Sequence, residues 1–240
     1  MDHHFPLIVA EFGSSPAREA WDSKAMAYRG WNLEPWCQSA HQVGADAVKI
    51  QLWRVEHFPI EEQKSKRRLE FPRDKLSSFV KTAHDLYLLA GASVFDAEAI
   101  ELASEHCDFI KLAAREQYNS DLIFQVFTQD KRIMRSVSDM AFRTGDNKSS
   151  RVTTLFAVQV YPTSIALALY WLIRFSMHCK RSGYRWGWSS HTRSALDCVV
   201  AARLGASVIE KHFALMPEDI EAGHSLLPDA FGRMVKDIRR

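Results

Sequence analysis

The sequence lacks a cysteine framework and a strong excess of either charge. With 31 basic and 29 acidic residues its formal net charge is +2, which is too close to neutral to favour a nucleic-acid or membrane partner. No cysteine pair has the CxxC spacing of a zinc ribbon, and the wide spacing also argues against a disulfide-rich scaffold. We therefore expect a reduced, cytoplasmic protein, whose four cysteines are Cys37, Cys107, Cys179 and Cys198.

The sequence also has little that would anchor the protein in a membrane. Its most apolar run, "IALALYWLI" at 165–173, ends before Arg174, whereas about 20 residues are needed to span a bilayer. The N-terminus "MDHHFPLIVAEFG" has no basic region followed by a long apolar core, so it does not read as a signal peptide. We expect no contact with a membrane.

What the sequence does contain is a regular alternation of strand and helix patterns. Hydrophobic residues make up 47% of the 240 residues, enough for a large core. Apolar runs of strand type separated by helical patterns indicate an α/β protein with a parallel sheet, and eight of them indicate a closed (β/α)8 TIM barrel that occupies 1–240 as one domain. The runs are 7–12, 46–52, 92–95, 108–112, 132–137, 154–160, 185–189 and 207–213.

Three of the connecting segments show a clear helical period. The segment 72–91 predicts a helix that stops at Gly91. The segment "SALDCVVAARLG" predicts a helix capped by Ser194, and "PDAFGRMVKDIRR" predicts one that opens at Pro228.

Two connections depart from this pattern. Residues 13–33 have no clean period and predict a long first βα loop. Residues 138–153 are too short and polar for a full barrel helix, so we expect the fifth helix to be reduced to a loop.

Polar residues gather at the predicted strand ends, which is where barrel enzymes hold their catalytic groups. For any one of them taken alone, a satisfied polar group in the core or a loop residue is the better explanation. Their joint occurrence on apolar strands favours a site. They are Glu11, Lys49, Gln51, Ser93, Lys111, Ser136, Gln159, Tyr161, Ser189, His191, Glu210 and His212.

These residue types indicate a particular chemistry. Two lysines buried in strands are costly without an anion, so Lys49 and Lys111 with nearby serines predict a phosphate or carboxylate site. The imidazoles of His191 and His212 would suit a divalent metal. Glu11, at the first strand end, could act as a general acid or base.

Several motifs then point to one family. The segments "VAEFG", "GADAVKIQ", "IKLA", "VYPTS", "GWSSHT", "LGASVIEKHFAL" and "GHSLLPDAFGRMVKDIR" occur in order along the chain. Together they resemble the catalytic barrel of the sialic acid synthase (N-acetylneuraminate synthase) family. The resemblance implies a metal-dependent condensation of phosphoenolpyruvate with a sugar aldehyde, N-acylaminosugar-like, to give a 2-keto acid and phosphate.

The resemblance also implies roles for single residues. His191 and His212 match the metal ligands, with Mn²⁺ as the expected ion and Mg²⁺ or Co²⁺ as alternatives, and Glu11 joins them as a catalytic residue. Gln51 and Tyr161 match positions that face the sugar. The positions that match the phosphoenolpyruvate site are Lys49, Ser93, Lys111, Ser136, Gln159 and Ser189.

Several motifs depart from the family pattern. "AEFGSSPAR" lacks the usual Asn and His, "KLAARE" has Ala114 and Arg115 in place of Ser and Gly, and "EAGH" lacks the Asp beside His224. The family's C-terminal antifreeze-like domain is expected to be absent, since the sequence stops at Arg240; a homodimer is one assembly that this allows.

These departures keep two other hypotheses open. The first is a degenerate, non-catalytic barrel that binds an anionic ligand or a partner protein. The second is another metal-dependent barrel enzyme, such as an aldolase or isomerase acting on a phosphorylated sugar.

Overall fold

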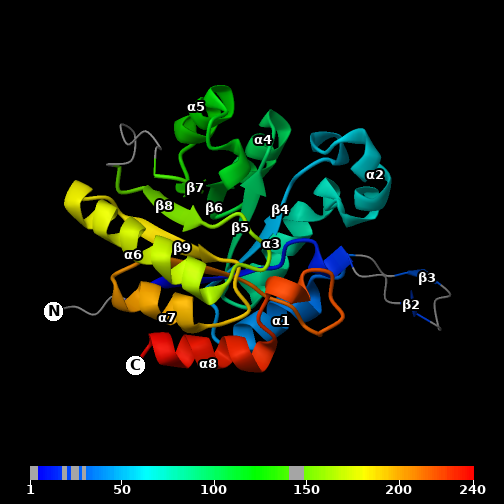
Figure 1. The fold of residues 1–240 in the computed structure, drawn as a ribbon. Helices are drawn as coiled ribbons and strands as arrows, with labels where there is room; N and C mark the ends of the chain where they lie inside the picture. The colour runs from blue at the N-terminus through cyan, green and yellow to red at the C-terminus, as the bar shows by residue number, and fades with distance from the viewer. Residues whose placement is uncertain (1–4, 18–20, 23–26, 29–30, 141–148) are drawn as a thin grey trace.

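Eight parallel strands form a closed barrel in the computed structural model, which describes residues 5–17, 21–22, 27–28, 31–140 and 149–240. Around the barrel the strand order is β1-β10-β9-β8-β7-β6-β5-β4. This confirms the (β/α)8 barrel, and Figure 1 shows the helices around the outside of the strands. The strands are β1 (Leu7–Glu11), β4 (Ala47–Gln51), β5 (Leu89–Val94), β6 (Phe109–Leu112), β7 (Arg132–Val137), β8 (Val152–Ala157), β9 (Trp186–Ser190) and β10 (Val208–His212).

The register of these strands brings their polar ends together. Glu11 of β1 lies beside His212 of β10 on one side and beside Lys49 of β4 on the other. Ser93 of β5 is likewise level with Lys111 of β6. Residues far apart in the sequence therefore form one ring at the carboxyl end of the barrel.

A small apolar cluster fills the barrel interior below this ring. Its larger members include Phe109, Met134 and Leu155, all buried. The ring of Phe109 occupies the space beside Gly91, where an added Cβ would lie 2.1 Å from the aromatic ring. Gly91 is thus needed for close packing inside the barrel.

Helices cover the outer face of most of the strands, and all of them except the one at Ile60–Lys66 bury residues on one side. Asp96, Asn119 and Ser164 cap three of them by accepting hydrogen bonds from the backbone of the first turn. The helices are α1 (Glu34–Gln42), α2 (Ile60–Lys66), α3 (Leu76–Asp85), α4 (Ala97–His106), α5 (Ser120–Thr128), α6 (Ile165–Ser182), α7 (Leu196–Arg203) and α8 (Pro228–Ile238).

Two predicted helix boundaries were wrong. The third helix ends at Asp85 and Tyr87 turns the chain with a φ of 58°, so Gly91 belongs to β5 and is not a helix stop. The cap of α7 is Ala195; the Ser194 hydroxyl instead accepts a hydrogen bond from the Leu196 backbone. The start of α8 at Pro228 is confirmed.

The irregular connections lie where the sequence indicated. Between β1 and α1 the chain forms a 3₁₀ turn, Ser15–Ala17, and a two-stranded ribbon of β2 (Trp21–Asp22) and β3 (Ala27–Tyr28), seen at the right of Figure 1. The described residues between β7 and β8, 138–140 and 149–151, contain no helix, and the rest of this predicted loop lies outside the description. Among the described helices, none is long and apolar enough to cross a membrane.

Candidate active site

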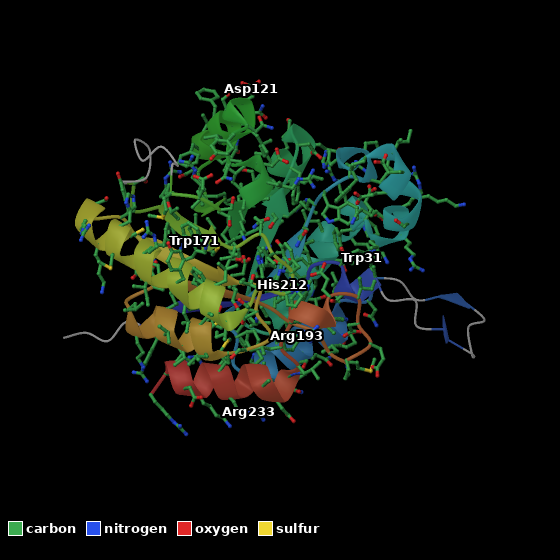
Figure 2. The ribbon with its side chains drawn as sticks, viewed as in Figure 1. Trp31, Asp121, Trp171, Arg193, His212 and Arg233 are labelled. Atoms are coloured by element: carbon green, nitrogen blue, oxygen red, sulfur yellow. The ribbon has the colours of Figure 1, made fainter. Side chains whose placement is uncertain are left out.

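A cavity of about 400 Å³ opens at the carboxyl ends of the strands. Nearly every residue predicted for the site lines it, and Ser189 lies directly behind Glu210, to which its hydroxyl donates at 2.7 Å. His212 is near the centre of the molecule in Figure 2. The predicted residues that line the cavity are Glu11, Lys49, Gln51, Ser93, Lys111, Ser136, Gln159, Tyr161, His191 and His212.

The two lysines at the bottom of the cavity are paired with carboxylates of the protein itself. Lys49 forms an ion pair with Glu11 and donates to the Ser93 hydroxyl at 2.6 Å. The Lys111 ammonium lies 2.5 Å from Oε1 of Glu210. The burial of these lysines therefore does not by itself require a bound anion, which corrects the argument made from the sequence.

The charges in this network shift one another's pKa. Burial would raise the pKa of Glu210, but the ammonium groups of Lys111 and Lys49 outweigh it and hold that pKa well below its usual value. Burial tends to lower the pKa of Lys49, yet Glu11 and Glu210 keep it raised. For Lys111 burial prevails and the pKa is lowered, which makes it the lysine that gives up a proton more readily.

Glu11 is fixed by the backbone and by Gln51. Its Oε1 accepts hydrogen bonds from the backbone of Gly13 at 2.9 Å and from the Gln51 side chain at 3.0 Å. The side chain is fully buried at the end of β1. One predicted sugar-facing residue, Gln51, thus also orients the predicted catalytic carboxylate.

His191 is held in one tautomer by the backbone. Its Nδ1 lies 2.6 Å from the carbonyl oxygen of Val158, and because a carbonyl only accepts, Nδ1 carries the proton and Nε2 is left bare. Burial, with a smaller contribution from His212, holds the pKa of His191 well below its usual value. A neutral imidazole with one bare nitrogen is the form that binds metals.

Two residues near the histidines were missed by the sequence argument: Glu221 and His224, on the loop between β10 and α8. Glu221 accepts from the Ser14 backbone at 2.7 Å, and its other oxygen lies 2.8 Å from Nδ1 of His212. A Cβ at Gly13, whose φ is 54°, would lie 1.9 Å from that oxygen, so a larger residue there would be strained and would displace the Glu221 carboxylate. Both residues belong to the segment "EAGH", which we interpreted from the sequence only as a departure from the family pattern.

Glu210 lines the cavity on the lysine side. From its place beside His212 on the last strand, we expected it to be a neighbour that orients the site. Its Oε1 contacts Lys111 across the barrel and Ser189 on the neighbouring strand β9. The carboxylate beside His212 is that of Glu221.

The donor atoms around His212 fit a divalent ion. His212 Nδ1 and Glu221 Oε2 are both buried, and neither makes a hydrogen bond of acceptable geometry to any residue that the structure describes. Imidazole nitrogen with carboxylate oxygen is a common ligand set for first-row divalent metals. The arrangement is thus compatible with the metal predicted from the sequence.

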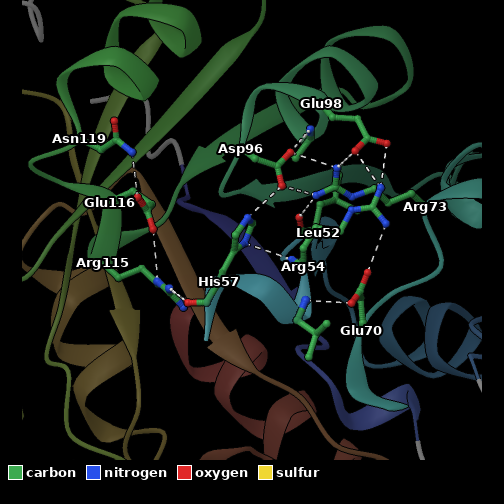
Figure 3. Close-up of polar contacts among 12 residues, drawn as sticks. Leu52, Arg54, His57, Glu70, Arg73, Asp96, Glu98, Arg115, Glu116 and Asn119 are labelled. Atoms are coloured by element: carbon green, nitrogen blue, oxygen red, sulfur yellow. Dashed lines mark hydrogen bonds and ion pairs between the residues drawn. The ribbon is translucent and has the colours of Figure 1, made fainter. Parts of the chain in front are cut away.

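The outer rim of the cavity is built by the segment between β4 and α3. The Arg115 guanidinium donates to the His57 carbonyl at 2.8 Å and lies over the ring of Phe58, 5.1 Å from its centroid. Arg73 anchors the same segment by contacts with the Leu52 carbonyl at 2.8 Å and with Asp96 at 2.5 Å. Figure 3 shows this network of arginines and carboxylates, which ties the rim segments to one another.

Comparison with known proteins agrees with this geometry. The family model described as the NeuB family matches residues 36–240. This chain belongs to the NeuB family. The match confirms the resemblance to sialic acid synthases that the sequence motifs indicated.

Individual relatives are more distant. The pseudaminic acid synthase of Helicobacter pylori is 28% identical over 201 residues, which cover 79% of this chain and 57% of the relative. That of Campylobacter jejuni is 24% identical and covers 85% of this chain and 67% of the relative. The chain thus spans roughly three fifths of the length of the curated relatives it matches.

Solved structures with the same fold include an N-acetylneuraminic acid (sialic acid) synthetase from Leptospira borgpetersenii. It superposes with a TM-score of 0.85 at 19% identity and covers 99% of this chain and 84% of that one. A phospho-2-dehydro-3-deoxyheptonate aldolase from Thermotoga maritima superposes with a TM-score of 0.69 at 13% identity, covering 99% of this chain and 69% of that one. At these identities the likeness establishes the fold only.

Proposed function

We propose that this chain condenses phosphoenolpyruvate with a sugar aldehyde, N-acylaminosugar-like, to form a 2-keto acid and phosphate. Membership of the NeuB family supports the reaction class. The observation that carries the proposal is that Lys49, Lys111, His191 and His212 line one cavity at the carboxyl end of the barrel. The anionic phosphoenolpyruvate requires cations, which lie at one side of the cavity. The aldehyde requires polarisation by a metal, whose potential ligands lie at the other side.

In this proposal phosphoenolpyruvate binds at the bottom of the cavity. Lys49 and Lys111 with the surrounding hydroxyls would contact its carboxylate and phosphate. The hydroxyl of Ser136 is buried and makes no hydrogen bond to a described residue, so it is available to such a ligand. Since Glu11 and Glu210 already balance the two lysines, the anion needs further positive charge. Arg115 and Lys66 also line the cavity and would contribute part of it, although each has a carboxylate partner of its own.

The sugar aldehyde binds on the histidine side, beside Gln51 and Tyr161. A divalent ion there would supply Lewis-acid polarisation of the aldehyde oxygen. C3 of phosphoenolpyruvate forms the new carbon–carbon bond with the aldehyde carbon, water adds at C2, and phosphate leaves with cleavage of the C–O bond. Glu11, held by Gly13 and Gln51, is placed to take the proton of that water.

The direct test is phosphate release by the purified protein with Mn²⁺, phosphoenolpyruvate and a panel of N-acylaminosugars and aldoses. The proposal expects release with at least one sugar, accompanied by a 2-keto acid in equal amount. No release across the panel would contradict it.

A non-catalytic barrel that binds an anion is the second candidate. It is favoured by the internal charge balance of the lysines and by Ala114, which lines the cavity where the family has a serine. Calorimetry with phosphoenolpyruvate separates the two: binding without phosphate release across the panel would favour this candidate.

A further inference from the structure

We propose that His212, Glu221 and His224 together form the divalent-metal site, so that the loop between β10 and α8 supplies two of its three protein ligands. The proposal deepens the proposed function and rests on its metal requirement. It differs from the ligand pair expected from the sequence, His191 and His212, by placing the ion toward the loop.

The geometry of the three side chains fits one ion. Their ligand atoms all lie within 4.8 Å of one another. Oε2 of Glu221 is 2.8 Å from Nδ1 of His212 and 3.7 Å from Nε2 of His224. Ligands about 2.1 Å from an octahedral ion are about 3.0 Å apart when adjacent and about 4.2 Å apart when opposite, so the separations of 2.8 and 3.7 Å fall within the range of one coordination sphere.

Two of the atoms are buried and lie 2.8 Å apart without a well-aligned hydrogen bond. His212 Nδ1 and Glu221 Oε2 are buried, and among the described residues neither has a hydrogen bond of acceptable geometry, although they lie close together. An unpaired buried polar atom is unfavourable. An ion bound by both atoms satisfies them at once.

The loop that carries the two new ligands is held by contacts with the rest of the chain. The second oxygen of Glu221 accepts from the Ser14 backbone, and the Glu221 backbone donates to the Ser15 hydroxyl at 3.2 Å. The His224 carbonyl accepts from the buried ammonium of Lys211 at 3.4 Å. Fixed ligands bind a metal with less loss of conformational freedom.

The position of His191 supports the same assignment. Its ring centroid is 5.4 Å from that of His212 and 6.4 Å from that of His224, whereas His212 and His224 are 4.5 Å apart. Tyr161 packs against His191 at 4.3 Å. His191 is therefore the most distant of the three imidazoles from the centre of the cluster and the nearest to the sugar side.

The test is Mn²⁺ binding to the full chain after metal removal with EDTA, followed by calorimetry and by electron paramagnetic resonance. We expect Glu221→Gln and His224→Asn each to raise the Kd for Mn²⁺ at least tenfold. Pulsed resonance of the bound ion would show couplings to nitrogens of two histidines in the wild type and of one in His224→Asn. Glutamine keeps an oxygen for the Ser14 backbone, so the loop is preserved in the first variant.

Matched controls come from the same loop and from a distant helix. Glu218→Gln changes an exposed carboxylate of the loop, and His41→Asn an exposed imidazole on α1. Both are expected to bind Mn²⁺ within twofold of the wild type. Thermal unfolding of every variant in EDTA, expected to match the wild type, identifies a variant that has lost its fold rather than a ligand.

Three outcomes separate this proposal from the proposed function. Wild-type Mn²⁺ affinity in Glu221→Gln and His224→Asn, with loss in His191→Asn, would overturn the triad and leave the condensation intact. Wild-type phosphate release in EDTA without measurable Mn²⁺ binding would also overturn it. Loss of Mn²⁺ affinity in both triad variants, with no phosphate release by the wild type on any sugar, would support the triad and contradict the proposed function.

Discussion

The inner and outer ends of one cavity are built in different ways. At the inner end Glu11, Lys49, Lys111 and Glu210 come from strands, and each is buried with a charged partner. At the outer end Gln159 and Tyr161 come from a loop and are exposed, with one hydrogen bond of 3.3 Å between them. The comparison predicts that changes at the inner end affect folding and catalysis together, while changes at the outer end affect the choice of ligand.

The largest effect is expected from Lys111→Met, because it leaves the buried carboxylate of Glu210 without its partner at 2.5 Å. We expect a loss of about 3–5 kcal/mol in the free energy of unfolding, measured with urea. The matched control is the double variant Lys111→Met, Glu210→Gln, which should recover most of that loss. A single variant as stable as the wild type would remove the basis for treating this ion pair as part of the folded core.

An uncharged change at the inner end should have a smaller effect. Gly91→Ala places a methyl group against the ring of Phe109, and we expect a loss of about 1–3 kcal/mol from overpacking. The control is Gly232→Ala in α8, where a Cβ would meet its nearest neighbour at 3.5 Å, and where alanine should be neutral or stabilise by about 1 kcal/mol. Equal effects of the two substitutions on urea unfolding would contradict this account of the barrel interior.

At the outer end Tyr161→Phe removes a hydroxyl and keeps the ring that packs on His191. Stability should change by less than about 0.5 kcal/mol. If the hydroxyl contacts the sugar, steady-state kinetics should show a rise in KM for the sugar of about fivefold, the size of one hydrogen bond. The Kd for phosphoenolpyruvate, measured by calorimetry, should not change. A large change would mean that the outer end of the cavity also contributes to phosphoenolpyruvate binding.

The smallest expected effect is the pH dependence of stability that arises from His57 and Asp96 at the rim of the cavity. Burial lowers the pKa of His57; for Asp96 burial acts in the opposite direction, but Arg73 and the Ala99 backbone prevail and lower its pKa. Both groups therefore bind fewer protons in the folded than in the unfolded state, so stability falls as the pH drops below their unfolded values, about 6.5 and 3.9. The melting temperature should fall on acidification from pH 7, and His57→Gln should flatten the part between pH 7 and 5. If the melting temperature of His57→Gln depended on pH in the same way as that of the wild type, His57 would not contribute to the loss of stability on acidification.

Much of the inner end could be predicted from the sequence. Buried parallel strands read as apolar runs, and lysines or acids at the ends of such runs, such as Lys49 and Lys111, must face the barrel mouth. What could not be predicted depends on loops. Glu221 meets Ser14 across 207 positions of sequence, and the extra helix α2 arises in a connection that gave no clear signal.

The same reason explains the errors. Glycine commonly ends a helix, which is why Gly91 was predicted to do so, but here it lies in a strand and makes room for the ring of Phe109. The partner of Glu210 was equally hard to predict, because Lys111 lies on β6, 99 positions away in the sequence. Residue identity misled at Gly91, and the contacts of Glu210 depend on the closed barrel.

The central claim is that the inner end of the cavity holds phosphoenolpyruvate. A crystal structure of the full chain with Mn²⁺ and phosphoenolpyruvate tests it most directly. The account predicts that the carboxylate and phosphate of the ligand lie within hydrogen-bonding distance of the ammonium groups of Lys49 and Lys111, with open space left beside Tyr161 for the sugar. A ligand bound at the rim on Arg115 and Lys66, with the ion pairs of Lys49 and Lys111 undisturbed below it, would contradict the claim.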